Sequence, residues 1–213
     1  MKSVIFDLDG TLLDTLDDLT ASTNFALKSC NYPLHTVDEV RRMVGNGVAM
    51  LIRRAMPAGH TQQQFDDCFG VFREYYSLHC NDNTKPYDGI LDMLNRLYSS
   101  GVGLAVASNK LQPAVQKLVA HYFPMIKVAV GDSPEYGRKP APDMLIKAMK
   151  QLDSTSHDTL YVGDSEVDVA TARNAAVRCV SVLWGFRDKE QLLANGATQF
   201  AYTPCEILSF MDL

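Results

Sequence analysis

The spacing of apolar residues changes twice along this chain and divides it into three stretches. Residues 3–8 form a short apolar run that predicts a buried strand. The next roughly 70 positions repeat their apolar residues at helical spacing, so this stretch is expected to be entirely helical. Expected helices cover residues 15–30, 36–44, 48–56 and 61–80, the second beginning with the capping box Thr36-Val37-Asp38-Glu39 and ending at Gly45-Asn46-Gly47.

From Tyr87 onward, helical and strand-like patterns alternate. Expected helices cover 90–100, 112–121, 143–152 and 167–176, and expected strands cover 102–107, 126–130, 159–162 and 178–183. A final helix is expected at Thr203-Pro204-Cys205-Glu206, which places a capping residue, a proline and a glutamate in the order that opens helices. Regular alternation of this kind predicts a parallel sheet that is covered by helices on both faces.

The helical stretch separates the first strand from the other strands. The simplest interpretation is an α/β fold, in which residues 1–14 and 85–213 form a Rossmann-like parallel sheet core and residues 15–84 form an inserted α-helical domain. The two connections between them would then act as hinges. An insert that directly follows a strand end is well placed to close over a site at that end.

Composition excludes several classes of protein. The 213 residues carry a net charge of −5, so we expect neither a nucleic-acid partner nor a basic membrane-binding surface. No apolar run approaches the ~18 residues of a membrane span, and Asp7 and Asp9 interrupt the first apolar stretch, so we also expect no signal peptide. The five cysteines are odd in number and widely spaced, which favours a reducing, cytoplasmic location over a disulfide framework or a zinc site.

Polar residues stand where three of the expected strands end. They are Asp7 and Asp9 at the first strand, Ser108 and Asn109 after the second, and Asp164 and Asp168 after the fourth. Open parallel sheets bind ligands at the carboxyl ends of their strands. These strand ends, together with Lys139, are therefore expected to converge on one site.

The spacing of Asp7 and Asp9 favours a metal ion. Residues two apart on a strand point to the same face, and Gly10 lets the chain turn away at once. Two such carboxylates repel one another unless a cation intervenes, and Mg²⁺ prefers a few carboxylates together with water and phosphate oxygens. Asp164 and Asp168 would complete the cage. Taken alone, the Asp-Gly-Thr segment is equally compatible with a simple turn.

The same residues suit phosphoryl transfer. A carboxylate can attack a phosphoryl group and form an aspartyl-phosphate, while a second carboxyl gives the leaving oxygen a proton and later takes one from water. Asp7 and Asp9 fit these two roles. Ser108 and Asn109 offer a hydroxyl and backbone N–H groups to phosphate oxygens, although a helix cap is the commoner explanation of such a pair. Lys139 could neutralise both the phosphate and Asp7.

In order and spacing, these segments resemble the four motifs of the haloacid dehalogenase superfamily of phosphohydrolases, and the resemblance covers essentially the whole chain. It implies that Asp7 is the nucleophile and Asp9 the general acid and base. Ser108 corresponds to the second motif and Lys139 to the third. The helical insert resembles the small α-helical cap of the family.

The resemblance also implies a Mg²⁺ site built from the fourth motif and the first. The metal would bind the Asp7 carboxylate, the backbone carbonyl of Asp9 and the Asp164 carboxylate. Asp168 would support these ligands without binding the metal directly.

Within the superfamily, the phosphoglycolate phosphatase-like members are the most similar. Val44-Gly45-Asn46-Gly47-Val48 resembles their cap loop, Arg53 and Arg54 follow it, and Lys110 after Ser108-Asn109 also matches. We expect Gly45, Asn46, Gly47 and Arg53 to select the substrate. Ala175-Ala176 departs from the Ala-Gly that is usual in these relatives, at a position that shapes a helix end.

The sequence therefore predicts a Mg²⁺-dependent phosphatase for a small phosphorylated metabolite, acting as a monomer or homodimer. A pyrophosphatase, a nucleotidase and a sugar-phosphate phosphatase or mutase stay open as alternatives, because the core motifs recognise only the phosphoryl group and the metal. A non-catalytic binding protein on the same fold is a further alternative, which the completeness of the motifs disfavours.

Overall fold

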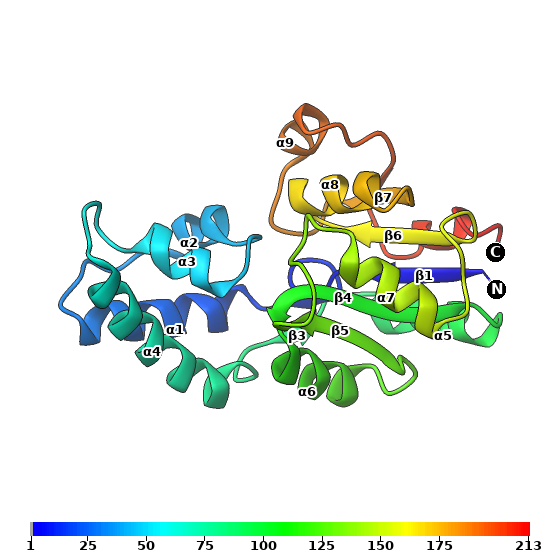
Figure 1. Ribbon diagram of the computed structural model, residues 1–213. Coiled ribbons are helices and arrows are strands. Elements are labelled where there is room, and N and C mark those ends of the chain that lie inside the picture. The colour runs from blue at the N-terminus through cyan, green and yellow to red at the C-terminus, as the bar shows by residue number, and fades with distance from the viewer. Residues whose placement is uncertain (1) are drawn as a thin grey trace. The chain divides into compact units, whose positions relative to one another are not determined.

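The computed structural model describes residues 2–213 and separates the chain into two compact units. One unit consists of the N-terminal residues up to Leu13 together with Pro86–Leu213, and the other is Asp14–Lys85. The first unit contains a large sheet and the second is built mainly of helices (Figure 1).

The sheet of the first unit has six strands in the order β5-β4-β1-β6-β7-β8, and all neighbouring pairs are parallel. The strands are β1 (Ser3–Phe6), β4 (Gly103–Leu111), β5 (Val128–Asp132), β6 (Thr159–Gly163), β7 (Arg178–Val182) and β8 (Phe200–Ala201). The short first strand lies between β4 and β6, and Phe6 at its end pairs with Val106 on one side and Val162 on the other. The carboxyl ends of three strands are thus brought to one edge of the sheet.

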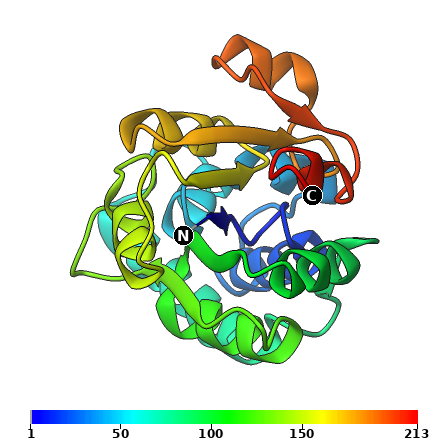
Figure 2. The ribbon, with the colours of Figure 1, turned by 90° about the vertical axis from the view of Figure 1, so that its right-hand side faces the viewer.

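Helices cover both faces of this sheet, as the alternating pattern predicts. They are α5 (Ile90–Ser99), α6 (Gln112–Tyr122), α7 (Asp143–Gln151), α8 (Glu166–Asn174), α9 (Lys189–Ala194) and α10 (Glu206–Ser209). Successive strand residues point to opposite faces. Val4 and Phe6 pack with α5, α6 and α10, whereas Ile5 packs with α7 and α8. Figure 2 shows α10 beside α5 on the first of these faces. The predicted fold class is confirmed.

The second unit is a cluster of four helices around its own apolar core. They are α1 (Leu16–Ser29), α2 (Val37–Met43), α3 (Val48–Ala55) and α4 (Gln62–His79). Thr36 opens α2 with the predicted capping box, and Thr61 opens α4 with a second one. No helix described here is both long enough and apolar enough to cross a bilayer.

The two connections between the units pair with each other, which the sequence pattern did not predict. The strands β2 (Leu13–Asp14) and β3 (Lys85–Pro86) form a separate two-stranded sheet. Two residues are too few to show an alternating pattern, so these strands are invisible to periodicity. The stretch from 15 to 84 is otherwise helical, as expected.

Three further details differ from the sequence prediction. β4 continues through Ser108 to Leu111 instead of ending at residue 107, with a shift of register along the way. The last helix begins at Glu206, because the Glu206 carboxylate accepts hydrogen bonds from the Tyr202 amide and the Thr203 hydroxyl and so holds residues 202–206 in a turn. The short elements α9 and β8 were not predicted at all.

Candidate active site

Three aspartates meet at the carboxyl edge of the sheet. Asp7 directly follows β1, and its amide donates to the carbonyl of Val162 in β6 (2.9 Å), which continues the sheet pairing by one residue. Asp164 follows β6, and Asp168 lies in the first turn of α8. One carboxylate oxygen from each residue lies within 4.8 Å of the other two, and all three residues are buried. The convergence expected from the strand ends is present.

The turn after β1 is shaped to fit around Asp164. Gly10 has a φ of +82°, and a Cβ atom there would collide with the carboxylate of Asp164. Gly185 is equally confined, since its Cβ would collide with the Gly10 carbonyl oxygen and would lie 2.7 Å from Asp164 Oδ2. The Asp164 oxygens accept hydrogen bonds from the Thr11 hydroxyl (3.2 Å) and the Phe186 amide (2.8 Å). Two glycines therefore make room for this carboxylate, and two donors orient it.

Lys139 supplies the positive charge at the centre of the cluster. Its Nζ atom lies 2.9 Å from Asp7 Oδ1 and 2.8 Å from Asp168 Oδ1, and its side chain is 2% exposed. The side-chain amide of Asn109 fixes the backbone of this lysine by donating to its carbonyl (3.0 Å) and accepting from its N–H (2.9 Å). The side-chain amide of Asn109 thus positions Lys139, whereas phosphate binding by the backbone at Ser108 and Asn109 stays a prediction. Ser108, buried beside it, accepts a 3.4 Å hydrogen bond from the Lys110 amide.

Asp168 is fully engaged by its neighbours. Its Oδ1 atom accepts from Lys139 and from the Tyr161 hydroxyl (2.7 Å), and its Oδ2 atom accepts from the Ser165 amide (3.0 Å) and hydroxyl (2.6 Å). The Tyr161 hydroxyl also lies 3.0 Å from Lys139 Nζ. These bonds suit a residue that holds Lys139 in place.

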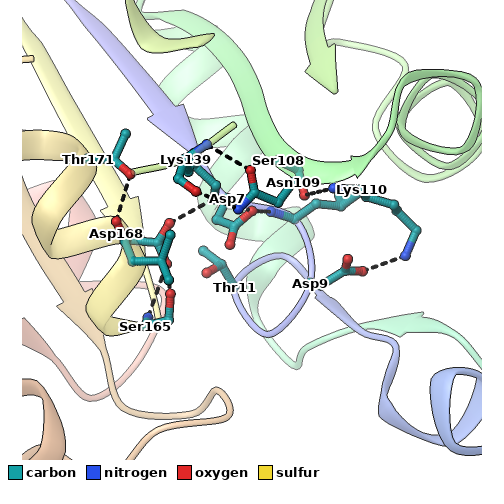
Figure 3. A network of polar contacts seen from close by, with 12 residues as sticks. Asp7, Asp9, Thr11, Ser108, Asn109, Lys110, Lys139, Ser165, Asp168 and Thr171 are labelled. Carbon is teal, nitrogen blue, oxygen red and sulfur yellow. Dashed lines mark hydrogen bonds and ion pairs between the residues drawn. The ribbon is translucent and has the colours of Figure 1, made fainter. Parts of the chain in front are cut away.

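Asp9 stands apart from this network and has a lysine of its own. Lys110 Nζ lies 2.7 Å from Asp9 Oδ1, and the Asp9 side chain is 16% exposed (Figure 3). The two aspartates of the first motif, Asp7 and Asp9, are therefore held by different lysines from different elements.

The charges of the cluster are not balanced. Burial raises the pKa of Asp7 to about 7, despite the nearby Lys139 ammonium, and Asp168 contributes to the rise. Burial and the negative charges of Asp168 and Asp7 hold the pKa of Asp164 well above its usual range. Asp168 differs: burial acts against its charge, but attraction to Lys139 and hydrogen bonds from its neighbours lower its pKa. The pKa of Lys139 is raised, because the negative charges of Asp168 and Asp7 outweigh the effect of its burial.

This arrangement fits a divalent cation. Four carboxylates (Asp7, Asp9, Asp164 and Asp168) face two ammonium groups (Lys110 and Lys139), which leaves two negative charges when all are ionised. Hard divalent ions favour oxygen ligands of this kind. Asp7 and Asp164 have the raised pKa values that a cation would relieve, whereas Asp168 is already satisfied by protein donors. Asp7 and Asp164 are therefore the carboxylates best suited to hold it.

The residues expected to select the substrate lie in the helical unit. Gly45, with a φ of +126°, Asn46 and Gly47, with a φ of +82°, form the loop between α2 and α3. Arg54 holds this loop, since its guanidinium donates to the Met43 carbonyl and to Asn46 Oδ1, both at 2.7 Å. Arg53 does not contact it through any bond recorded in the described residues: its guanidinium stacks on Phe65 at 4.0 Å and donates to Gln62.

Four polar residues that bond to the site aspartates, namely Thr11, Lys110, Tyr161 and Ser165, were not among the predicted site residues. Tyr161 lies inside an apolar strand. Because a buried tyrosine hydroxyl needs a hydrogen-bond partner, its position in this strand could have indicated a role in a polar network. Lys110 was noted as a match to relatives but given no role. Its partner Asp9 lies about a hundred positions earlier in the sequence, and periodicity carries no information about such pairs.

Comparison with known proteins agrees with this geometry. The family model described as haloacid dehalogenase-like hydrolase matches residues 4–182. Phosphoglycolate phosphatase 1 of Pseudomonas aeruginosa is 34% identical over 92% of this chain and 75% of its own length, and the phosphoglycolate phosphatase of Agrobacterium fabrum is 33% identical over 86% and 81%. A solved structure from Lactobacillus delbrueckii subsp. bulgaricus, described as a candidate phosphoglycolate phosphatase, has a TM-score of 0.94 at 36% identity and covers 99% of both chains.

Proposed function

Since this chain belongs to the haloacid dehalogenase-like hydrolase family and is a phosphatase acting on phosphoric monoesters, we propose that it hydrolyses phosphoglycolate, with Mg²⁺ as cofactor and Asp7 as nucleophile. The observation that carries the proposal is the buried Asp7 carboxylate 2.9 Å from Lys139 Nζ, next to Asp164. The substrate is taken from the relatives, which are phosphoglycolate phosphatases at about the same identity along most of the chain.

Each residue of the cluster has a role in the proposed reaction. Asp7 attacks the phosphorus atom and becomes an aspartyl-phosphate, while Asp9 gives a proton to the leaving oxygen and later takes one from the attacking water. Lys139 stabilises charge on the phosphoryl oxygens, and the Ser108 hydroxyl donates to one of them. Asp168 keeps Lys139 in position through a 2.8 Å ion pair.

Mg²⁺, when bound by Asp7, Asp164 and the Asp9 carbonyl, would offset the negative charge shared by the phosphoryl group and its nucleophile. The excess of negative charge in the site supports this assignment. The pKa of Asp7, about 7, leaves this carboxyl partly protonated at neutral pH unless further positive charge is supplied. In the helical unit, the Gly45–Gly47 loop stays the proposed source of substrate selection, with Arg54 as the arginine that holds it.

Steady-state kinetics on a panel of substrates test the proposal. We expect kcat/KM for phosphoglycolate to exceed that for pyrophosphate, nucleotides and sugar phosphates by at least about tenfold, since sites that bind a polar substrate group discriminate strongly against substrates without it. Activity should disappear on dialysis against EDTA and return with Mg²⁺. A clear preference for another member of the panel would contradict the proposed substrate, and full activity in EDTA would contradict the cofactor.

A further inference from the structure

Lys110 is a buried cation beside the active site. It lies on β4 directly after Ser108 and Asn109, and its side chain is only 1% exposed. Burial of an ammonium group is costly unless the group is paired and hydrogen-bonded. The pairing is with Asp9, whose Oδ1 atom accepts a 2.7 Å hydrogen bond from Lys110 Nζ. In Figure 3 the lysine side chain reaches across to the turn that carries Asp9.

Asp9 depends on this contact for its orientation. Within residues 2–213, Lys110 is the one group recorded as donating a hydrogen bond to the Asp9 carboxylate, and the bond uses only Oδ1. The Asp9 backbone is fixed by the turn after β1, where it bridges to Leu13, but the turn leaves the side-chain torsions free. The ion pair is therefore what selects one side-chain orientation, with Oδ2 left available.

The second lysine of the site cannot replace the first. Lys139 Nζ is already shared among Asp7, Asp168 and the Tyr161 hydroxyl, at 2.8 to 3.0 Å. The two lysines also come from different elements, since Lys110 lies on β4 and Lys139 in the loop before α7. Lys139 pairs with the proposed nucleophile, Asp7, and Lys110 pairs with the proposed general acid, Asp9.

We propose that Lys110 is a positioning residue for Asp9, an inference that rests on the proposed function. By fixing Oδ1, Lys110 directs Oδ2 of Asp9 to the leaving oxygen. As the phosphoryl group passes to Asp7 and its bond to the leaving oxygen breaks, the proton on Oδ2 moves to that oxygen. Water then attacks the aspartyl-phosphate, its proton returns to Oδ2, and phosphate leaves as Asp7 is regenerated.

Leaving-group dependence distinguishes this role from a merely structural one. The alkoxide that leaves phosphoglycolate needs a proton, whereas p-nitrophenolate leaves readily without one. The measured quantity is the single-turnover rate of leaving-group release. We expect Lys110→Met to lower this rate by about 100-fold with phosphoglycolate, which is within the range that one general acid contributes. With p-nitrophenyl phosphate we expect a loss of less than about threefold. Lys110→Arg, which keeps a donor and a charge, should recover part of the loss with phosphoglycolate.

A double-mutant cycle with Asp9 completes the test. If Lys110 acts only through Asp9, Lys110→Met should cost nothing further in an Asp9→Asn background. Lys147→Met is the matched control: Lys147 pairs with Glu135 at 3.4 Å on the surface of the same unit, and its loss should leave both rates unchanged. Should Lys110→Met fail to fold, Lys110→Arg is expected to show the same leaving-group dependence at smaller amplitude.

Three results would overturn the inference. They are equal losses with both substrates, a raised KM for phosphoglycolate at unchanged kcat, which would mean that Lys110 binds the substrate, and an undiminished effect in the Asp9→Asn background. Absence of hydrolysis by the wild-type protein is a distinct outcome, because it would overturn the proposed function and this inference with it.

Discussion

The Asp7 carboxylate links the chemistry of the site to the stability of the fold. Its pKa is raised from the usual value to about 7, first by burial and then by neighbouring carboxylates. A raised carboxyl pKa means that the folded state binds the proton more tightly than the unfolded state does. The contribution of Asp7 to stability is therefore greatest in acid and is lost as the pH rises toward about 7. Asp168, whose pKa is lowered, contributes in the opposite sense and only at lower pH.

Asp7→Asn should reveal this dependence in the metal-free protein. The amide resembles the protonated carboxyl, so the variant should not lose stability as the pH rises. We expect the melting temperature of the variant minus that of wild type to be larger at about pH 8 than at about pH 5, by several degrees. Calorimetry in EDTA at the two pH values measures the difference. A difference that stays constant across this range would show that burial of Asp7 does not disfavour its charge.

At the residue scale, the sequence predicted the residues that stand at strand ends and missed those that connect them. Asp7 and Asp164 could be brought together from the general geometry of parallel sheets. The hydrogen bonds of Tyr161 and the ion pair of Lys110 depend on side-chain packing between distant segments. Asn109 illustrates the limit, since its place beside the site was predicted and its partner, the backbone of Lys139, was not.

Among the elements, the two ends of the helical unit are fastened by one buried carboxylate. Asp18, in the first turn of α1, is 2% exposed and accepts hydrogen bonds from the amides of Asn83 and Thr84, from the Asn83 side chain and from the Thr84 hydroxyl, at 2.7 to 3.1 Å. Both oxygens are used. The segment that leaves the helical unit is thus tied to the helix that enters it.

Replacement of Asp18 should therefore destabilise the helical unit. We expect Asp18→Ala to lower the free energy of unfolding by about 2–4 kcal/mol, since it leaves several donors of residues 83–84 without a partner. Asp17→Ala is the control, because Asp17 is the exposed neighbour on the same turn. Urea denaturation compares the three proteins, and equal stabilities of the two variants would contradict the role assigned to Asp18.

Element length explains which parts of the fold could be predicted. The helices of 14 and 18 residues, α1 and α4, show several turns of apolar periodicity and were found from the sequence. The two-residue strands β2, β3 and β8 are stabilised by pairing with distant segments and carry no such pattern. The end of β4 was placed too early because polar residues, which commonly end a strand, here continue one.

In the whole molecule, chain order and sheet order together account for the site. The strand that comes first in sequence, β1, lies at the centre of the sheet, with β4 and β6 on either side. The large helical segment lies between β1 and β4 in the sequence, and the segments that carry Asp7, Lys110 and Asp164 come from widely separated parts of the chain. Their meeting at one edge is a consequence of parallel pairing, in which strands start and finish together.

Detection of a phosphoryl group on Asp7 is the most direct test of the proposed chemistry. The protein would be mixed with phosphoglycolate and Mg²⁺, quenched in acid during turnover and examined by peptide mass spectrometry. We predict a phosphorylated peptide containing Asp7 in the wild-type protein, and neither phosphorylation nor phosphate release in a folded Asp7→Asn variant. Normal turnover by that variant, or turnover of the wild type without any phosphorylated aspartate, would contradict Asp7 as the nucleophile.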